Sequence, residues 1–307
     1  MTFKEKLLSG KTVVTLELSP PKGTNVEALL NQARGLVGYV DAINVPDCQL
    51  SILKMSSMVA AALIQNEVGL ETIWQLTCRD RNLIALQSDL MGGYALGLRN
   101  MLALTGDPIQ LGDQKDHAKQ VFHLDSTRLQ ELICALNRGE DATGKALKHG
   151  GTNFMVGAAL NPFRVQKRAQ QLRLQQKIEN GVTFFQTQPV YSIDPIEPML
   201  AAVSEAAQAV GKPTPRVLVG IIPPKNAQAA RYMNQAVVGI EIPESFIELL
   251  EKAEDPSAES IRYCADLVES IKPLCNGFHF MPVGMVSKIG TLLEQCFPIN
   301  QMAEKSV

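Results

Sequence analysis

The sequence has few of the features that mark secreted, membrane-spanning or metal-binding proteins. Its 307 residues include six cysteines, none spaced as a CxxC pair, and four histidines without an HExxH motif. We therefore expect reduced, mostly buried thiols, and the composition disfavours a structural zinc site carried by this chain alone. No apolar run approaches roughly 18 residues and no signal-peptide core is present, so we expect a cytoplasmic protein without a membrane span.

An excess of charge of either sign is also missing. The 29 Lys and Arg residues against 31 Asp and Glu residues leave a net charge of −2. A protein that tracks a phosphate backbone normally carries a basic excess, so nucleic-acid binding as the main activity is disfavoured. With 46% hydrophobic and 20% charged residues, the chain has the composition of an ordinary globular protein.

What the sequence does contain is a repeated alternation of short apolar runs and longer segments of helical character. Continuous apolar runs are typical of strands buried on both faces, which indicates a parallel sheet. There are eight such runs: Val13–Leu18, Asp41–Val45, Thr72–Thr77, Asn100–Thr105, Asn153–Leu160, Val182–Gln188, Arg216–Ile222 and Gly277–Val283.

Eight candidate helices separate or follow these runs. They are Val26–Val37, Leu53–Gln65, Arg81–Leu96, Ser126–Asn137, Arg164–Asn180, Pro195–Val210, Ala227–Gln235 and a long stretch over Glu244–Lys272. Eight strand–helix units in about 300 residues predict an α/β fold, a (β/α)8 TIM barrel, in one domain over residues 1–307. A doubly wound open sheet is the alternative, although the first run continues into Ser19-Pro20-Pro21 without a GxGxxG turn.

Polar residues end several of the predicted strands, where the active site of such a barrel lies. Glu17 stands in the apolar context VVTLEL and is costly to bury. It could form a core ion pair, or its pKa could be raised so that it serves as a general acid. Asp107 could be ordinary Gly-Asp-Pro turn chemistry, and Gln188 could satisfy backbone groups at a strand edge.

Taken together and in order, the strand ends resemble those of the methylenetetrahydrofolate reductase family. The resemblance covers residues 12–296 and implies a (β/α)8 barrel, in agreement with the strand count. It rests on Leu16-Glu17-Leu18-Ser19-Pro20-Pro21, Leu104-Thr105-Gly106-Asp107, Lys177 four residues before Gly181, Thr187-Gln188, Gly220-Ile221-Ile222-Pro223-Pro224, Ile242-Pro243 and Phe278-His279-Phe280.

The resemblance implies that a bound flavin reduces 5,10-methylenetetrahydrofolate to 5-methyltetrahydrofolate, by hydride transfer from flavin N5, in one-carbon metabolism and methionine biosynthesis. Glu17 matches the general acid that protonates folate N10, and Gln188 matches the amide that binds the pterin. Asp107 matches the acid beside the flavin, and Lys177 the partner of the cofactor phosphate. The other expected flavin contacts are Asn44, Gln75, Thr105, Gly106, Phe122, Ala158 and Asn161.

Departures from the family pattern leave some implications open. The differing positions are Thr105, Gln75, Gln170, Ala227, Met281 and Met285. The first three leave FMN as an alternative to FAD. The last three fall where substrate or nicotinamide would bind, so the electron donor is either NAD(P)H or a partner electron-transfer subunit. Family resemblance also implies a homo-oligomer.

Two other functions compete with a flavin-dependent reductase. One is a flavin-free, folate-binding scaffold subunit of a one-carbon enzyme complex, which would account for Thr105, Gln75 and Ala227 together. Retention of Glu17, Asp107, Gln188 and Lys177 argues against it, since a scaffold needs none of them. The other is a phosphosugar lyase or aldolase, which we disfavour because no lysine stands at a strand end to form a Schiff base.

Overall fold

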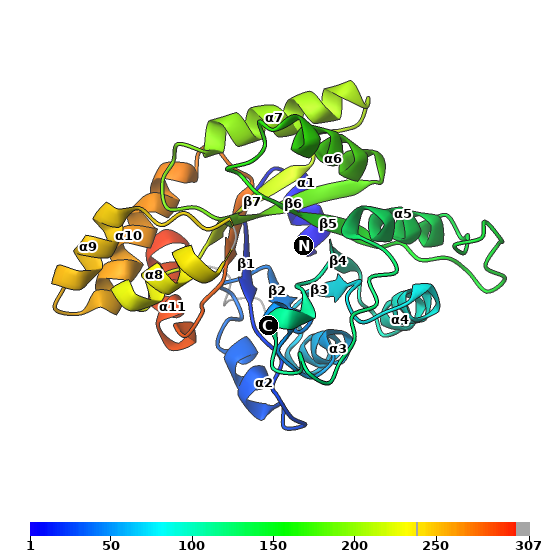
Figure 1. Cartoon of the computed structure of the whole chain (residues 1–307), viewed down its shortest axis with the longest axis horizontal. Helices are drawn as coiled ribbons and strands as arrows, with labels where there is room; N and C mark the ends of the chain where they lie inside the picture. Colours follow the sequence, from blue (N-terminus) through cyan, green and yellow to red (C-terminus); the bar gives the residue numbers. More distant parts are fainter. Residues whose placement is uncertain (238, 299–307) are drawn as a thin grey trace.

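Eight parallel strands close into a barrel in the order β1 to β8, as the sequence predicts (Figure 1). The structure, a computed structural model, describes residues 1–237 and 239–298. Strand β1 pairs with β8, for example Val14 with Phe278, and this pairing closes the barrel. The strands are β1 (Val13–Glu17), β2 (Ala42–Val45), β3 (Thr72–Thr77), β4 (Asn100–Leu104), β5 (Met155–Leu160), β6 (Val182–Pro189), β7 (Arg216–Ile221) and β8 (Gly277–Phe280).

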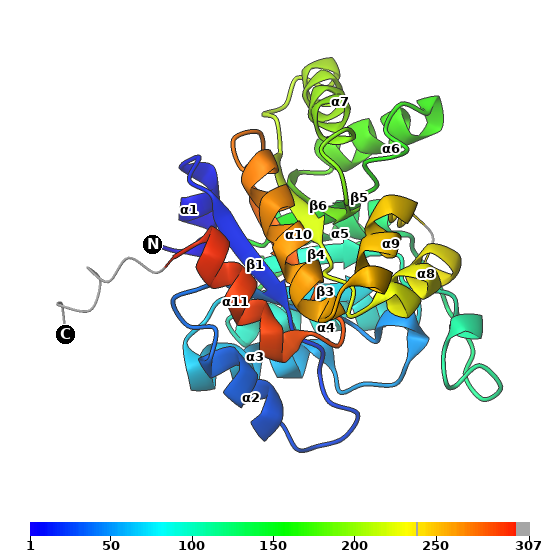
Figure 2. The ribbon, with the colours of Figure 1, turned by 90° about the vertical axis from the view of Figure 1, so that its left-hand side faces the viewer.

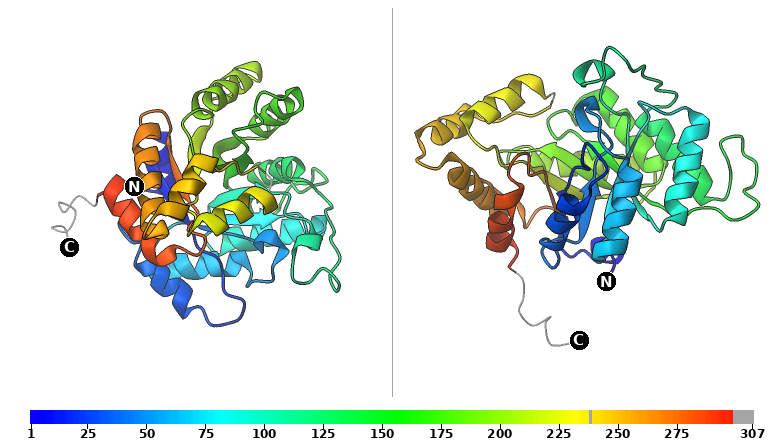
Figure 3. Two further views of the ribbon diagram at one scale, coloured as in Figure 1. Left: turned by 60° about the vertical axis from the view of Figure 1, so that its left-hand side comes forward. Right: turned by 90° about the horizontal axis from the view of Figure 1, so that it is seen from below.

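Helices surround the barrel and cover the outer faces of the strands (Figures 1 and 3). Helix α10 packs beside α11, and α8 packs beside α9 (Figure 2). The helices are α1 (Phe3–Leu8), α2 (Glu27–Arg34), α3 (Ser57–Val68), α4 (Leu83–Ala95), α5 (Ser126–Asn137), α6 (Arg168–Glu179), α7 (Ile196–Ala209), α8 (Ala227–Ala236), α9 (Glu244–Lys252), α10 (Pro256–Ile271) and α11 (Val286–Cys296).

The predicted helix over Glu244–Lys272 is wrong as a single element, because it is broken between α9 and α10. Asp255 has an extended backbone and accepts hydrogen bonds from the N–H groups of Ser257 and Ala258, and Pro256 follows at the first helical position. Proline cannot donate the backbone hydrogen bond that a continuous helix needs, but it suits a helix start. Helices α1 and α11 were not among the predicted elements, and β8 ends at Phe280 rather than Val283.

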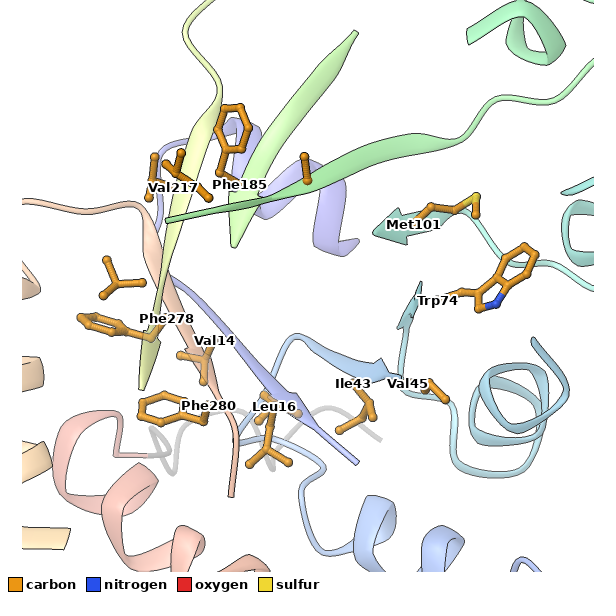
Figure 4. Close-up of a cluster of buried hydrophobic side chains, with 14 of the residues drawn as sticks. Val14, Leu16, Ile43, Val45, Trp74, Met101, Phe185, Val217, Phe278 and Phe280 are labelled. Atoms are coloured by element: carbon orange, nitrogen blue, oxygen red, sulfur yellow. The ribbon is translucent and has the colours of Figure 1, made fainter. Parts of the chain in front are cut away.

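Most of the core lies between the strands and the surrounding helices. Figure 4 shows its outward-facing strand residues, among them Val14, Trp74 and Phe278, each at most 4% exposed. A second cluster fills the barrel at its N-terminal end, where Phe3 and Leu7 of α1 pack with Phe184 and strand residues around it. The aromatic rings of Phe3 and Phe184 meet edge to face, with centroids 5.7 Å apart. This end of the barrel is therefore sealed by apolar packing.

Helices α8 and α9 have a small core of their own. Phe246 stacks on Tyr263 with ring centroids 3.8 Å apart, and Tyr191 packs against Phe246. The tyrosine hydroxyls are satisfied, because Tyr191 donates to the Ile222 carbonyl at 2.9 Å and Tyr263 donates to the Tyr191 carbonyl at 2.7 Å. The α8–α9 pair is thereby tied to the ends of β6 and β7.

The described residues contain neither a membrane-spanning helix nor a cluster of metal ligands. No helix in residues 1–237 and 239–298 combines the length and apolar character needed to cross a bilayer. Within the same ranges, no group of three or more His, Cys, Asp or Glu side chains converges as a metal site would require. The six cysteines are free thiols, three of them fully buried.

Candidate functional site

Glu17 ends β1 at the C-terminal mouth of the barrel and is held by two neutral amides. Gln75 of β3 donates through Nε2 to Glu17 Oε2 at 3.2 Å, and Gln49 donates through Nε2 to Oε1, also at 3.2 Å. No ion pair to Glu17 occurs among the described residues, so the core ion-pair interpretation is not supported. A cavity of about 260 Å³ opens beside the carboxyl, lined also by Ser19, Gln32 and Gly284.

Burial raises the pKa of Glu17 to about 7, from an ordinary value of 4.5. The hydrogen bonds from Gln75 and Gln49 oppose this shift, because they favour the ionised form, but desolvation is the larger effect. A carboxyl with this pKa is substantially protonated at neutral pH and can also release its proton there. Such a group meets the requirement for a general acid.

Because the raised pKa disfavours the folded ionised state, the Glu17→Gln variant is expected to be more stable than the native protein at alkaline pH. The folded protein keeps Glu17 protonated up to about pH 7, whereas the unfolded chain ionises near 4.5. The gain in unfolding free energy should therefore grow between these values and reach about 3 kcal/mol above pH 7. Urea unfolding at pH 4, 6 and 8 measures it; an equal difference at pH 4 and pH 8 contradicts the shift.

A buried polar layer lies directly below Glu17 inside the barrel. Asn44 and Gln186 form a reciprocal amide pair, with Nδ2 to Oε1 at 2.7 Å and Nε2 to Oδ1 at 3.0 Å. The Thr15 hydroxyl lies 3.0 Å from His279 Nδ1, and Gln186 Nε2 reaches the same hydroxyl at 3.4 Å. Burial lowers the pKa of His279 to about 3, so the imidazole is neutral. The floor of the site therefore offers neutral hydrogen-bonding groups without a charge.

Asp107, after the end of β4, is tied to the short turn Gln49–Ser51 that follows β2. Its Oδ2 accepts a hydrogen bond from the Leu50 N–H at 2.6 Å, and the Ser51 hydroxyl donates to the Asp107 carbonyl at 2.9 Å. The same turn supplies Gln49 to Glu17. The structure thus brings Glu17 and Asp107 to opposite ends of one turn, a link that the sequence did not predict.

The backbone at Thr105–Gly106 passes close to neighbouring side chains. Gly106 has φ +95°, and a Cβ there would lie 2.9 Å from Thr77 Cβ and 3.0 Å from Arg79 Cβ. Only glycine fits this conformation at this spacing. Phe122, another expected flavin contact, also has a positive φ of 41° and donates its N–H to the Arg79 carbonyl. Thr105 accepts a hydrogen bond from the Ser126 N–H at the start of α5.

Gln188 is partly buried and lies where the pairing of β6 with β7 is irregular. The register shifts between Gln186 and Pro189, and the Thr187 hydroxyl accepts the Gly220 N–H at 2.8 Å in place of a ladder bond. Such an irregularity redirects a side chain from the regular alternation. Gly239 approaches Gln188 and Asn161 closely, since a Cβ on it would lie 2.5 Å from Asn161 Nδ2 and 3.8 Å from Gln188 Cγ.

Lys177 of α6 reaches back over the end of β5. Its Nζ donates to the Ala159 carbonyl at 2.8 Å, and burial, together with nearby Arg173, lowers its pKa to about 8. A small pocket joins Lys177 and Arg173 to Asn161. A half-buried cation beside a second cation is a suitable receptor for an anionic group.

Among the expected site residues, Ala158 is placed away from the mouth. Its methyl group is fully buried in the core between strand and helices, whereas the flanking Gly157 faces the Phe184 ring inside the barrel. Side chains alternate along a strand, so Ala159 rather than Ala158 faces the barrel interior. Sequence reasoning also missed Gln49, Gln186 and His279 as site residues. Gln186 precedes Gln188 by two positions on β6. Residues two apart on a strand face the same side, so this spacing could have indicated that Gln186 also points into the barrel.

Comparison with known proteins provides evidence about the family of this chain. The family model described as methylenetetrahydrofolate reductase matches residues 2–296. Methylenetetrahydrofolate reductase 2 of Saccharomyces cerevisiae is 27% identical over 83% of this chain and 42% of its own length. Methylenetetrahydrofolate reductase 1 of Schizosaccharomyces pombe is 23% identical over 96% of this chain and 48% of its own. The chain thus spans less than half the length of these curated relatives.

A solved structure supports the fold. A Clostridium thermocellum protein, described as binding two copies of 5-methyl-5,6,7,8-tetrahydrofolic acid, superposes with a TM-score of 0.66. It is 15% identical, and the match covers 95% of this chain and 96% of that one. At this identity the likeness establishes the shared barrel.

Proposed function

The chain belongs to the methylenetetrahydrofolate reductase family, and from that premise we propose that it reduces 5,10-methylenetetrahydrofolate to 5-methyltetrahydrofolate with a bound flavin. The observation that carries the proposal is Glu17, a partly buried carboxyl at the barrel mouth, held by Gln49 and Gln75, with a pKa of about 7. The tetrahydrofolate ligand named for the Clostridium thermocellum protein supports a folate as the substrate.

The residues present fit a flavin. The strand end that would face the flavin ring is held in place by Gly106, because only glycine lets this backbone pack against Thr77 and Arg79. Gln75 of β3 offers an amide at the barrel mouth, and Lys177 with Arg173 would receive phosphate, whereas the Asn44 amide is buried and already paired with Gln186. We propose FAD as the cofactor, with FMN as the alternative. When bound, the flavin supplies a hydride to the one-carbon unit of the folate.

In this proposal Glu17 delivers the proton that opens the substrate ring. Protonation of folate N10 lets its bond to the methylene carbon break, which leaves that carbon as an N5 iminium ready to accept a hydride. Glu17 is suited to this step because it is still largely protonated near pH 7. Neutral neighbours matter, since a cation beside the carboxyl would lower its pKa and remove the acid.

Asp107 and Gln188 complete the proposed site. The Leu50 N–H orients the Asp107 carboxyl, and in this proposal that carboxyl would stabilise the cationic character that develops on the reacting folate. Gln188 presents both an amide donor and an acceptor, which match the donor–acceptor edge of a pterin.

The electron donor is a separate part of the proposal. Ala227 is buried in the small core of α8 and α9, Met281 packs against that core, and Met285 is 2% exposed. These three positions therefore present neither an aromatic ring nor a cation to a nicotinamide. We propose that a partner electron-transfer subunit, rather than NAD(P)H, reduces the flavin. Rapid NADH oxidation by the isolated chain with menadione as acceptor would overturn this part.

The experiment that tests the function combines cofactor analysis and turnover. Protein purified from an expressing cell should be yellow, and mass spectrometry of the ligand released on denaturation should identify FAD or FMN. The loaded protein, with its flavin reduced chemically, should convert 5,10-methylenetetrahydrofolate to 5-methyltetrahydrofolate. A colourless protein that binds folate without turnover, even after incubation with either flavin, would instead establish the scaffold function.

A further inference from the structure

The turn Gln49–Ser51 carries two contacts that matter to the site. The Gln49 amide donates to Glu17 Oε1 and the Leu50 N–H donates to Asp107 Oδ2. Both donors depend on the path of three consecutive residues, because one contact uses a side chain and the next uses the backbone. A change in this path would alter the surroundings of both carboxyls together.

The turn has an unfavourable backbone conformation. Cys48, Leu50 and Ser51 have φ values of 50°, 53° and 55°, in the left-handed region that non-glycine residues seldom occupy. Such residues persist only where the surrounding structure holds them in place. Gly112 packs so closely that a Cβ on it would overlap the Ser51 carbonyl.

Arg79 is the group that holds the turn from below. It is 2% exposed, and its Nη1 donates to the Cys48 carbonyl at 3.0 Å and to the Ser51 hydroxyl at 3.2 Å. One guanidinium is therefore hydrogen-bonded to the residues on both sides of the Gln49-Leu50 pair, Cys48 and Ser51. Asp80 holds the opposite edge of the guanidinium through Nε and Nη2, at 3.0 Å and 2.7 Å.

We propose that Arg79 is a positioning residue, which clamps the turn Gln49–Ser51 so that Gln49 reaches Glu17 and the Leu50 N–H reaches Asp107. The importance of these contacts for catalysis rests on the proposed function. The clamp itself is a property of this chain's own side chains. Arginine suits the task because its planar fork can bond two acceptors at once, which a lysine cannot do with the same geometry.

The titration of Glu17 reports whether Gln49 is held in place, because among the described residues only the neutral amides of Gln49 and Gln75 bond to that carboxyl. The titratable groups near Glu17 are neutral or already bonded to other residues. His279 below it is neutral, and Asp107 is bonded to Leu50. Asp47 pairs with Arg81, and Lys22, in the loop after β1, pairs with Asp113. Loss of the Gln49 hydrogen bond should therefore raise the pKa of Glu17 without a compensating charge.

The test is a carbon-13 NMR titration of glutamate side chains in the protein as purified, without folate. The Glu17 resonance is assigned by its absence in Glu17→Gln. Arg79→Gln and Ser51→Ala should each raise the pKa of Glu17 by about one unit, the effect of one hydrogen bond to a charged acceptor. Arg79→Lys should give a smaller rise. Arg138→Gln, which removes an exposed arginine paired with Glu140, should give none.

The unfolding midpoints of the variants distinguish a loss of positioning at Glu17 from a general loss of stability. If Arg79→Gln does not fold, Ser51→Ala decides, because it removes one of the two hydrogen bonds from Arg79 to the turn, the one at Ser51, without leaving a buried charge unpaired. A folded Ser51→Ala protein with an unchanged Glu17 titration overturns the proposal. Failure of the reductase proposal is a different result, absence of turnover by the native loaded protein, and it leaves this titration unaffected.

Discussion

Replacing Glu17 by glutamine is expected to lower turnover of 5,10-methylenetetrahydrofolate by about 10²- to 10⁴-fold while leaving the flavin bound and reducible. Positioned general acids contribute rate accelerations of this size. Glutamine keeps the shape of the side chain and can still bond to Gln49 and Gln75, but it cannot release a proton to N10. Anaerobic stopped-flow measurement of flavin reduction, and separately of its reoxidation by the folate, distinguishes the two half-reactions.

A matched control removes a carboxyl elsewhere on the chain. Glu67 lies exposed on α3, and Glu67→Gln should leave both half-reactions at the native rate. In the native protein, folate-dependent reoxidation should also slow as the pH rises above about 7, where Glu17 loses its proton. Reoxidation of Glu17→Gln at the native rate would remove Glu17 from the mechanism.

Replacing Lys177 by methionine is expected to weaken flavin binding by about 10- to 100-fold. This range corresponds to the loss of a hydrogen bond to a charged group, about 1.5–3 kcal/mol. Methionine preserves the length and apolar stem of lysine, so the packing of α6 against β5 is retained. Because burial lowers the pKa of Lys177 to about 8, flavin retention by the native protein should also weaken as the pH rises past that value. Equilibrium fluorescence titration of flavin measures both effects.

The control for this variant is Lys148→Met, at an exposed position in the loop before β5. It removes the same charge from an exposed position and should not change flavin affinity. Equal affinity for Lys177→Met and the native protein would return Lys177 to a structural role, bonding the Ala159 carbonyl at the end of β5.

The barrel could be predicted because its signals are local. Each strand is a continuous apolar run, and eight such runs with intervening helices are compatible with few folds other than a (β/α)8 barrel. Element ends were less predictable. The break before α10 had a sequence signal in Asp255-Pro256, and the start of α1 had one in Thr2 and Glu5, which form a capping box.

The site was predictable only in part, for a physical reason. Strand ends of a barrel converge on one mouth, so Glu17, Asn44 and Gln75 could be placed together from strand assignments alone. Gln186 and Asn44 are 142 residues apart, and nothing local indicates that their amides pair. Gln49 was missed because its role depends on a left-handed turn that Arg79 and Gly112 hold from distant segments.

The central claim is that this barrel transfers a hydride from flavin to folate, and one single-turnover measurement tests it most directly. The loaded protein is reduced anaerobically and mixed with a stoichiometric amount of 5,10-methylenetetrahydrofolate. The account predicts that the flavin is reoxidised and that one equivalent of 5-methyltetrahydrofolate forms per flavin. A flavin that stays reduced while the folate binds unchanged would contradict it.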